Sequence, residues 1–264
     1  MTDYQHLRLD TTPEGVRTIT LDRADKLNAV NGVLAASLVS ALADATHDDA
    51  VRVVVITGAG RAFCAGLDLS MPPELPTATR AERLDPYAWV GAWVRSVMAC
   101  EKPVIASVNG PAAGAGFGLA LACDVRIVAA TASMTAGYVR RGLSPDAGVS
   151  WFLPRHIGLA RAADILLTGR DVDAAEAERI GLAALVVPDA ELPAATAAYA
   201  SKLAAGAPIA QALTKRLLAE TFDRPLDATL RDELSHIKYC FTTTDVAEAM
   251  TAFREKRRPR FQGR

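Results

Sequence analysis

The sequence carries almost no net charge and no long uninterrupted apolar run. Its 29 basic and 30 acidic side chains leave a formal charge of −1 over 264 residues. A surface with this balance has no general attraction for nucleic acid or for an anionic membrane. The longest stretch without charge, residues 103–123, is broken by Asn109-Gly110-Pro111 and by further glycines, which argues against a spanning helix. We therefore expect neither a nucleic-acid partner nor a membrane partner.

Cysteines and targeting signals are also scarce. The four cysteines, Cys64, Cys100, Cys123 and Cys240, show no CxxC spacing, and three of them have apolar neighbours. This pattern favours free thiols in a reducing compartment. Residues 1–5 lack a basic start followed by an apolar run, so we expect no leader segment and a cytoplasmic location.

Several catalytic motifs are missing. The sequence has no GxSxG elbow, no HExxH pair and no phosphate-loop lysine motif, and its four histidines are isolated from one another. Gly114-Ala115-Gly116 begins a dinucleotide-binding pattern, but Leu119 stands where the third glycine is required. These absences argue against a serine hydrolase, a metalloenzyme and a Rossmann site.

The residues that are present predict an α/β layer in the first part of the chain. Half of all residues are apolar, enough for one sizeable core. Buried-strand patterns alternate with helical patterns, and this alternation implies right-handed crossovers. The expected strands are residues 16–21, 51–56, 104–108 and 125–128; the expected helices are 33–45, capped by Asn31, then 81–99 and 115–122.

The chain becomes mostly helical after Arg155. We expect alanine-rich helices, one short strand and a basic tail at residues 256–260. The helices are predicted at 160–168, 174–180, 191–205, 208–220, 226–241 and 245–256, and the strand at 185–187. We predict a core domain of residues 1–200 followed by a helical subdomain of residues 201–264.

Two segments share one design, in which an apolar strand leads through a glycine turn to an expected helix start. Residues 53–58 lead to 63–68, and residues 105–110 lead to 114–116. Glycine lets a ligand approach the backbone, and helix-start N–H groups are unpaired donors suited to negative charge. Each segment alone is better explained by close strand-to-helix packing. Two such donors together would form an oxyanion hole.

These segments resemble the crotonase (enoyl-CoA hydratase/isomerase) superfamily. Its pattern AFxAGxDL is matched by residues 62–69, and NGxAxGxGxxLAxxCD by residues 109–124. The resemblance also covers Lys26-Leu27-Asn28-Ala29, an early CoA-contacting turn, the active-site loop at residues 142–148, and the carboxyl-terminal helix at residues 253–257. It implies a crotonase-like spiral of ββα turns with a carboxyl-terminal helical subdomain. It also implies an acyl-CoA thioester substrate, a homotrimer or homohexamer, and no metal or redox cofactor beyond the coenzyme A of the substrate.

The resemblance also assigns roles to individual residues. The two oxyanion-hole N–H donors fall on Leu67 and Ala115. The expected coenzyme A contacts are Lys26, Leu27, Ala29, Ala65, Leu67, Asp68 and Leu69. Asp68 is itself of a type that commonly caps helices, and we expect that structural role for its side chain.

The sequence departs from the family pattern at the two glutamates that its hydratases use. Their positions hold Gly118 and Tyr138. The remaining acid in the active-site loop is Asp146, which lies where isomerases of the superfamily that act on epoxyphenylacetyl-CoA and dienoyl-CoA keep an aspartate. Its apolar neighbours should raise its pKa toward that of a useful base. The alternative is a structural role, in which Asp146 is a turn residue of the sequence Pro-Asp-Ala-Gly.

We therefore expect an enoyl-CoA double-bond isomerase with Asp146 as proton shuttle. An enoyl-CoA hydratase that uses Asp146, with or without Tyr138, is one alternative, and a non-catalytic acyl-CoA-binding protein is the other. Tyr138 is otherwise a packing residue. Tyr87, Trp89 and Trp93 either line the acyl pocket or form a core stripe. Lys256 and the tail arginines either contact CoA phosphates or are a solvated chain end.

Overall fold

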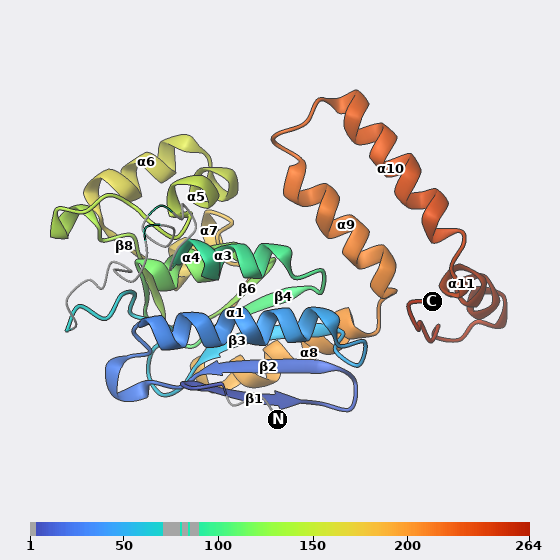
Figure 1. The fold of residues 1–264 in the computed structure, drawn as a ribbon, viewed down its shortest axis with the longest axis horizontal. Coiled ribbons are helices and arrows are strands. Elements are labelled where there is room, and N and C mark those ends of the chain that lie inside the picture. Colours follow the sequence, from blue (N-terminus) through green and yellow to red (C-terminus); the bar gives the residue numbers. More distant parts are fainter. Residues whose placement is uncertain (1–3, 71–79, 81–83, 85–89) are drawn as a thin grey trace.

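A six-stranded sheet forms the centre of the molecule in the computed structural model, which describes residues 4–70, 80, 84 and 90–264 (Figure 1). The strands lie in the order β1-β2-β3-β4-β6-β9, with β1 antiparallel to β2 and every other neighbouring pair parallel. Their bounds are Leu7–Thr11, Val16–Leu21, Val53–Gly58, Val104–Val108, Val125–Ala129 and Leu185–Val187.

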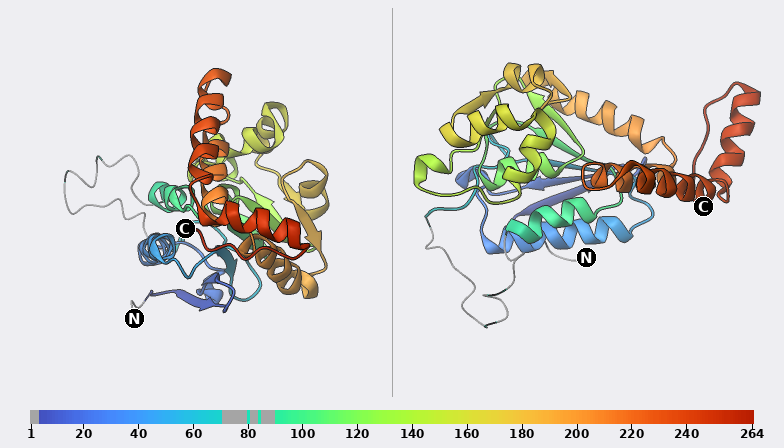
Figure 2. Two further views of the ribbon diagram at one scale, coloured as in Figure 1. Left: turned by 90° about the vertical axis from the view of Figure 1, so that its right-hand side faces the viewer. Right: turned by 90° about the horizontal axis from the view of Figure 1, so that it is seen from above.

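Helices cover both faces of this sheet, which explains why its central strands are almost wholly apolar. All five residues of β4 are buried. The helices α1 (Gly32–His47), α3 (Val90–Ala99) and α4 (Ala115–Ala122) lie on one face, and α8 (Leu192–Ala204) lies on the other (Figure 2). The predicted α/β layer is thereby confirmed.

A second sheet of three short strands lies beside the first. β5 (Ala112–Ala113) runs parallel to β7 (Ser133–Thr135), and β8 (Asp171–Asp173) pairs antiparallel with β7. The remaining core helices are α5 (Val149–Ile157), α6 (Leu159–Thr168) and α7 (Ala174–Arg179), and single 3₁₀ turns lie at Ala24–Lys26, Val139–Arg141 and Asp189–Glu191. Successive strand, strand, helix units form the expected spiral. β1, β5, β7, β8 and α5 are not among the elements predicted from the sequence.

The last three helices project from the core (Figure 1). They are α9 (Pro208–Glu220), α10 (Leu226–Cys240) and α11 (Thr244–Glu255). Lys215 of α9 ties them to the core, because its ammonium lies 2.7 Å from Asp124 Oδ2. Large apolar side chains on this part are more than half exposed: Leu218, Phe222, Leu226, Leu230, Leu234, Ile237, Phe241, Met250 and Phe253. The predicted boundary at residue 200 falls within α8, and the division into two domains stays a prediction.

Within the described ranges, no helix combines the length and the apolar character needed to cross a bilayer.

Candidate active site

The two glycine turns lie directly against each other. Cys64 N–H donates to Pro111 O at 3.1 Å, and Ala113 N–H donates to Cys64 O at 2.9 Å. A methyl group built on Gly66 (φ +90°) would lie 2.7 Å from Ala113 O and 3.6 Å from Ala115 N. Only glycine permits this approach, which brings the residue before Leu67 against the start of α4.

The N–H groups of Leu67 and Ala115 are the two expected donors. Neither N–H takes part in a hydrogen bond among the described residues. Ala115 is the first residue of α4, where Gly114 provides no side-chain cap. Leu67 forms an isolated bridge with Val30 and is not itself helical; residues 71–79, into which a helix from this segment would run, lie outside the described residues, so the helix start stays a prediction. An oxyanion hole requires two such unpaired donors, and the assignment of this role to Leu67 and Ala115 stays a prediction.

The early turn is bound tightly to the first glycine turn. Asn28 is completely buried, and its amide donates to Ala59 O at 2.9 Å and to Ala62 O at 2.8 Å. Ala65 N–H donates to Leu27 O at 3.0 Å. Both Leu27 and Asn28 have positive φ, a strained conformation that these hydrogen bonds offset. The predicted CoA-contacting residues on these two segments are therefore neighbours.

Asp68 anchors this arrangement through an ion pair with Arg23. The carboxylate and the guanidinium are 2.9 Å apart, and the two side chains are 6% and 11% exposed. Hydrogen bonds from Ser70 and then from Arg23 hold the pKa of Asp68 at about 2. Asp68 Oδ1 also accepts from Ser70 N–H at 3.1 Å, but a helix capped by Asp68 would run into residues 71–79, which lie outside the described residues, so the cap stays a prediction. Arg23 is not predictable as the partner of Asp68 from the sequence, since 45 residues separate the two.

The other predicted CoA contacts differ in exposure. Lys26 and Leu69 are exposed, Ala65 and Leu67 are half-buried, and Ala29 is buried.

Asp146 is half-buried and is held by Tyr138. The tyrosine hydroxyl donates to Asp146 Oδ1 at 2.7 Å, and Tyr138 is only 7% exposed. Burial raises the pKa of Asp146, and the Tyr138 hydrogen bond partly opposes the rise. Burial, followed by the charge of Asp146, raises the pKa of Tyr138 well above its usual range, so the phenol stays protonated. The direction expected for the Asp146 pKa from its apolar neighbours is confirmed.

The Asp146 loop packs on the same helix that supplies the Ala115 donor. A methyl group on Gly118 of α4 would lie only 2.5 Å from Ala147 O. At the beginning of α4, a methyl group on Gly114 would lie 3.9 Å from the Tyr138 ring. The acid and one expected donor are therefore placed by one helix. Position 118 has no room for a glutamate unless the loop moves.

Other predicted residues lie elsewhere. Tyr87 and Trp89 fall outside the described residues, and Trp93 is fully buried in α3 as a core residue. At the end of α11, Arg257 is paired with Glu248 and Glu255.

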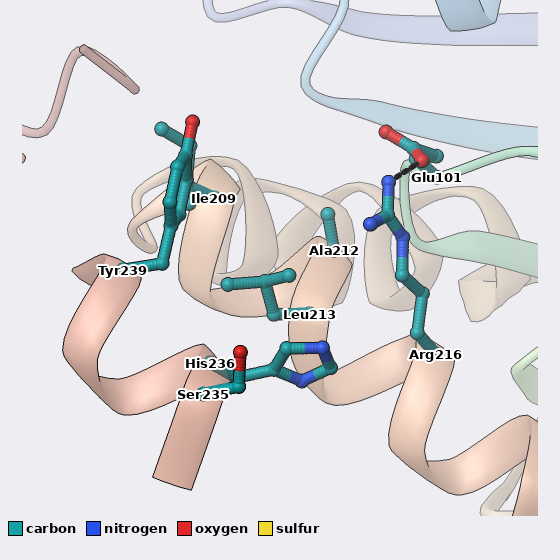
Figure 3. Close-up of a pocket in the computed structure, with 8 residues that line it drawn as sticks. All are labelled: Glu101, Ile209, Ala212, Leu213, Arg216, Ser235, His236 and Tyr239. Carbon is teal, nitrogen blue, oxygen red and sulfur yellow. Dashed lines mark hydrogen bonds and ion pairs between the residues drawn. The ribbon is translucent and has the colours of Figure 1, made fainter. Parts of the chain in front are cut away.

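A separate hollow of 360 Å³ lies between α9 and α10 (Figure 3). Arg216, His236 and Tyr239 help to line it, and it contains none of the predicted site residues. The described residues include no group of three His, Cys, Asp or Glu arranged to hold a metal.

Comparison with known proteins defines the class. The family model "Enoyl-CoA hydratase/isomerase" matches residues 11–264. A probable enoyl-CoA hydratase of Rhodobacter capsulatus is 39% identical over 265 residues, covering 99% of each chain. The 1,2-epoxyphenylacetyl-CoA isomerase of Escherichia coli is 35% identical over 257 residues, covering 97% of this chain and 98% of that protein.

Solved structures agree with this match. A putative enoyl-CoA hydratase from Streptomyces coelicolor superposes with a TM-score of 0.93 at 40% identity, covering 100% of this chain and 96% of the other. An enoyl-CoA hydratase from Bacillus anthracis gives 0.91 at 34% identity, covering 98% and 100%. The chain belongs to the enoyl-CoA hydratase/isomerase family. The resemblance and the fold class expected from the sequence are confirmed, and the relatives' names include both activities.

Proposed function

We propose that this family member is an enoyl-CoA double-bond isomerase that uses Asp146 as its single proton shuttle. The observation that carries the proposal is the state of this carboxylate. It is half-buried, its pKa is raised, and it lies on a loop packed against α4 at Gly118. One carboxylate suffices to move one proton, whereas adding water requires both an activated water and a proton for the α-carbon.

The proposed reaction begins with the thioester oxygen accepting hydrogen bonds from the Leu67 and Ala115 N–H groups. Asp146 removes a proton from C2 of a 3-enoyl-CoA, and the electrons of the C2–H bond form an enolate that the two donors stabilise. The electrons then return to form the C2=C3 double bond while the C3=C4 electrons take the proton from Asp146 at C4. The product is the conjugated 2-enoyl-CoA, and no water is consumed.

The hydratase alternative is supported by the names of several relatives, such as the Rhodobacter protein. In that reading Asp146, with Tyr138, would activate water. The non-catalytic alternative would keep the N–H donors and bind acyl-CoA without using Asp146. The name of the Escherichia coli relative supports the isomerase reading instead.

Wild type and Asp146→Asn assayed on a 3-enoyl-CoA and a 2-enoyl-CoA distinguish the three functions. Wild type should isomerise the 3-enoyl substrate and hydrate the 2-enoyl substrate slowly or not at all. Asp146→Asn should lose about 10²–10⁴-fold in isomerisation but still bind a non-reactive acyl-CoA. Rapid hydration by wild type would favour the hydratase. Tight binding without turnover of either substrate would favour the binder, and undiminished isomerisation by Asp146→Asn would show that another residue is the base.

The proposal also includes a homotrimer or homohexamer in the cytoplasm. The half-exposed apolar side chains of α9–α11 support self-association, because a monomer rarely leaves so many in water. The free thiols support a reducing compartment. The proposed reaction needs no metal or redox cofactor, so a chelator should leave its rate unchanged.

A further inference from the structure

Tyr138 makes hydrogen bonds to two parts of the loop that carries Asp146. The carbonyl oxygen of Tyr138 accepts hydrogen bonds from Arg141 N–H at 2.8 Å and from Leu143 N–H at 3.0 Å. The hydroxyl of the same residue reaches Asp146 Oδ1 at 2.7 Å. The backbone of Tyr138 therefore fixes the turn that leads to Asp146, and its side chain fixes the Asp146 carboxylate.

Tyr138 also touches the opposite side of the site. Its ring lies beside Gly114, the residue immediately before the Ala115 donor. It is 7% exposed, so it has little freedom to move away from either neighbour. A shift of the ring would thus displace the carboxylate relative to the start of α4.

The two carboxylate oxygens of Asp146 have different surroundings. Oδ1 accepts the Tyr138 hydrogen bond, whereas Oδ2 accepts none from the residues that the structure describes. Burial raises the pKa of Asp146, and the hydrogen bond from Tyr138 and the backbone N–H of Asp146 itself oppose the rise. A hydrogen bond donated to a carboxylate stabilises its ionised form.

We propose that Tyr138 is a positioning residue, which holds Asp146 through Oδ1 so that Oδ2 carries the proton between the two carbons of the substrate. This inference rests on the proposed isomerase function. It adds a role for Tyr138, which stands where the family's hydratases have a glutamate. Tyr138 fixes the position of the base Asp146 and favours its ionised form. Tyr138 need not exchange a proton with the substrate.

Tyr138→Phe tests this role because it removes one oxygen and keeps the ring beside Gly114. Loss of the hydrogen bond should raise the pKa of Asp146, so the acid limb of the kcat/KM profile should move up by about one pH unit. At neutral pH kcat should fall about 10-fold, because a charge-assisted hydrogen bond is lost. The loss in kcat/KM should be larger at pH values below the acid limb, where Asp146 is protonated, than above it, and KM should change little.

Tyr199→Phe is the matched control, since Tyr199 is a half-buried tyrosine on α8, outside the site. It should leave the profile unchanged. A second variant with 3-fluorotyrosine at position 138 keeps the shape and donates a stronger hydrogen bond, so it should move the limb to lower pH. This variant also decides the matter if Tyr138→Phe folds poorly.

An equal loss of kcat at every pH, or an unshifted limb in both position-138 variants, would overturn the inference and leave the isomerase proposal standing. Undiminished isomerisation by Asp146→Asn would instead overturn the proposed function itself. The two failures are therefore distinguishable.

Discussion

The two ends of α4 differ in the hydrogen-bond partners that the rest of the chain provides. At the C-terminal end, Arg126 Nη1 donates to Cys123 O at 2.7 Å and makes longer hydrogen bonds to Ala120 O and Leu121 O. His156 Nε2 lies 3.1 Å from the same Leu121 O. At the N-terminal end, Ala115 N–H has no acceptor among the described residues.

This contrast indicates where a ligand belongs. All eight residues of α4 are buried, and a buried helix must satisfy the free donors and acceptors at its ends. The chain supplies donors for the last carbonyls, including a buried arginine whose charge complements the negative end of the helix. The donor at the other end has no partner among the described residues, and under the proposed function its partner is the thioester oxygen of the substrate.

Among changes at the two ends of α4, the largest effect is expected from removing the free N–H at the N-terminal end. Ala115→Pro deletes the N–H, and proline is well tolerated at the first position of a helix. We expect kcat to fall about 10²–10³-fold, the usual effect of losing one oxyanion donor. Steady-state kinetics on a 3-enoyl-CoA measure the loss.

Gly32→Pro is the control for this substitution, because Gly32 begins α1 and a Cβ placed on it would have no atom within 4 Å. That variant should keep its kcat. A folded Ala115→Pro enzyme with wild-type kcat would remove Ala115 from the oxyanion hole.

A smaller effect, on stability rather than on chemistry, should follow from disturbing the capped end. Arg126→Met leaves buried carbonyl groups without their donor, and each unpaired carbonyl lowers the free energy of unfolding by roughly 1–3 kcal/mol. Part of this loss is offset because the variant no longer buries a charge. We expect the free energy of unfolding to fall by about 2–3 kcal/mol, as urea unfolding would measure.

Arg52→Met is the comparison variant. Arg52 also donates to two carbonyls, Gly206 O and Phe261 O, but it does not contact α4. If both variants lose stability and only Arg126→Met also lowers kcat, the capped end helps to position the open one. Unchanged stability in Arg126→Met would show that the cap contributes little.

The smallest effect at neutral pH should come from His156. Burial and then the charge of Arg126 lower its pKa from 6.5 to about 4. Below pH 6.5 His156 is protonated in the unfolded chain but stays neutral in the folded chain. The free energy of unfolding therefore decreases as the pH falls from about 6.5 to 4. The loss should reach on the order of 3 kcal/mol.

His156→Gln retains an N–H donor and does not titrate, so its stability should depend less on pH over this range. Equal pH dependence in the variant and in wild type would show that other groups cause the acid sensitivity.

The sequence predicted the elements that depend on local patterns. Asn31 was expected to cap a helix over residues 33–45, and its side chain accepts from Leu34 N–H at 2.8 Å at the start of α1, Gly32–His47. β2 and β4 have the expected bounds. Capping and buried β-branched runs are local properties, which is why they are readable without a structure.

The missed elements depend on contacts between distant segments. β5, β7 and β8 contain two or three residues each, and they exist only because they pair with one another. α5 begins at the active-site loop and contains Pro154, so its helical pattern was obscured. β1 is a short, exposed edge strand with little apolar signal.

The individual residues of the candidate site were predictable from the sequence, but the contacts between them were not. The motifs indicated Leu67, Ala115 and Asp146, but nothing in the sequence joins Tyr138 to Asp146 across their intervening turn. Arg126 does offer a signal in the sequence, because it is a charge inside an apolar strand. His156 was dismissed as isolated, although its ring binds the end of α4.

The most direct test of the account follows a labelled proton. A 3-enoyl-CoA with deuterium at C2 is converted in ordinary water, and mass spectrometry of the earliest product locates the label. A single half-buried carboxylate should deliver part of the deuterium to C4 of a conjugated 2-enoyl-CoA, because Asp146 exchanges slowly with water while the site is occupied. A 3-hydroxyacyl-CoA product, or a conjugated product without deuterium at C4, would contradict the single-carboxylate shuttle.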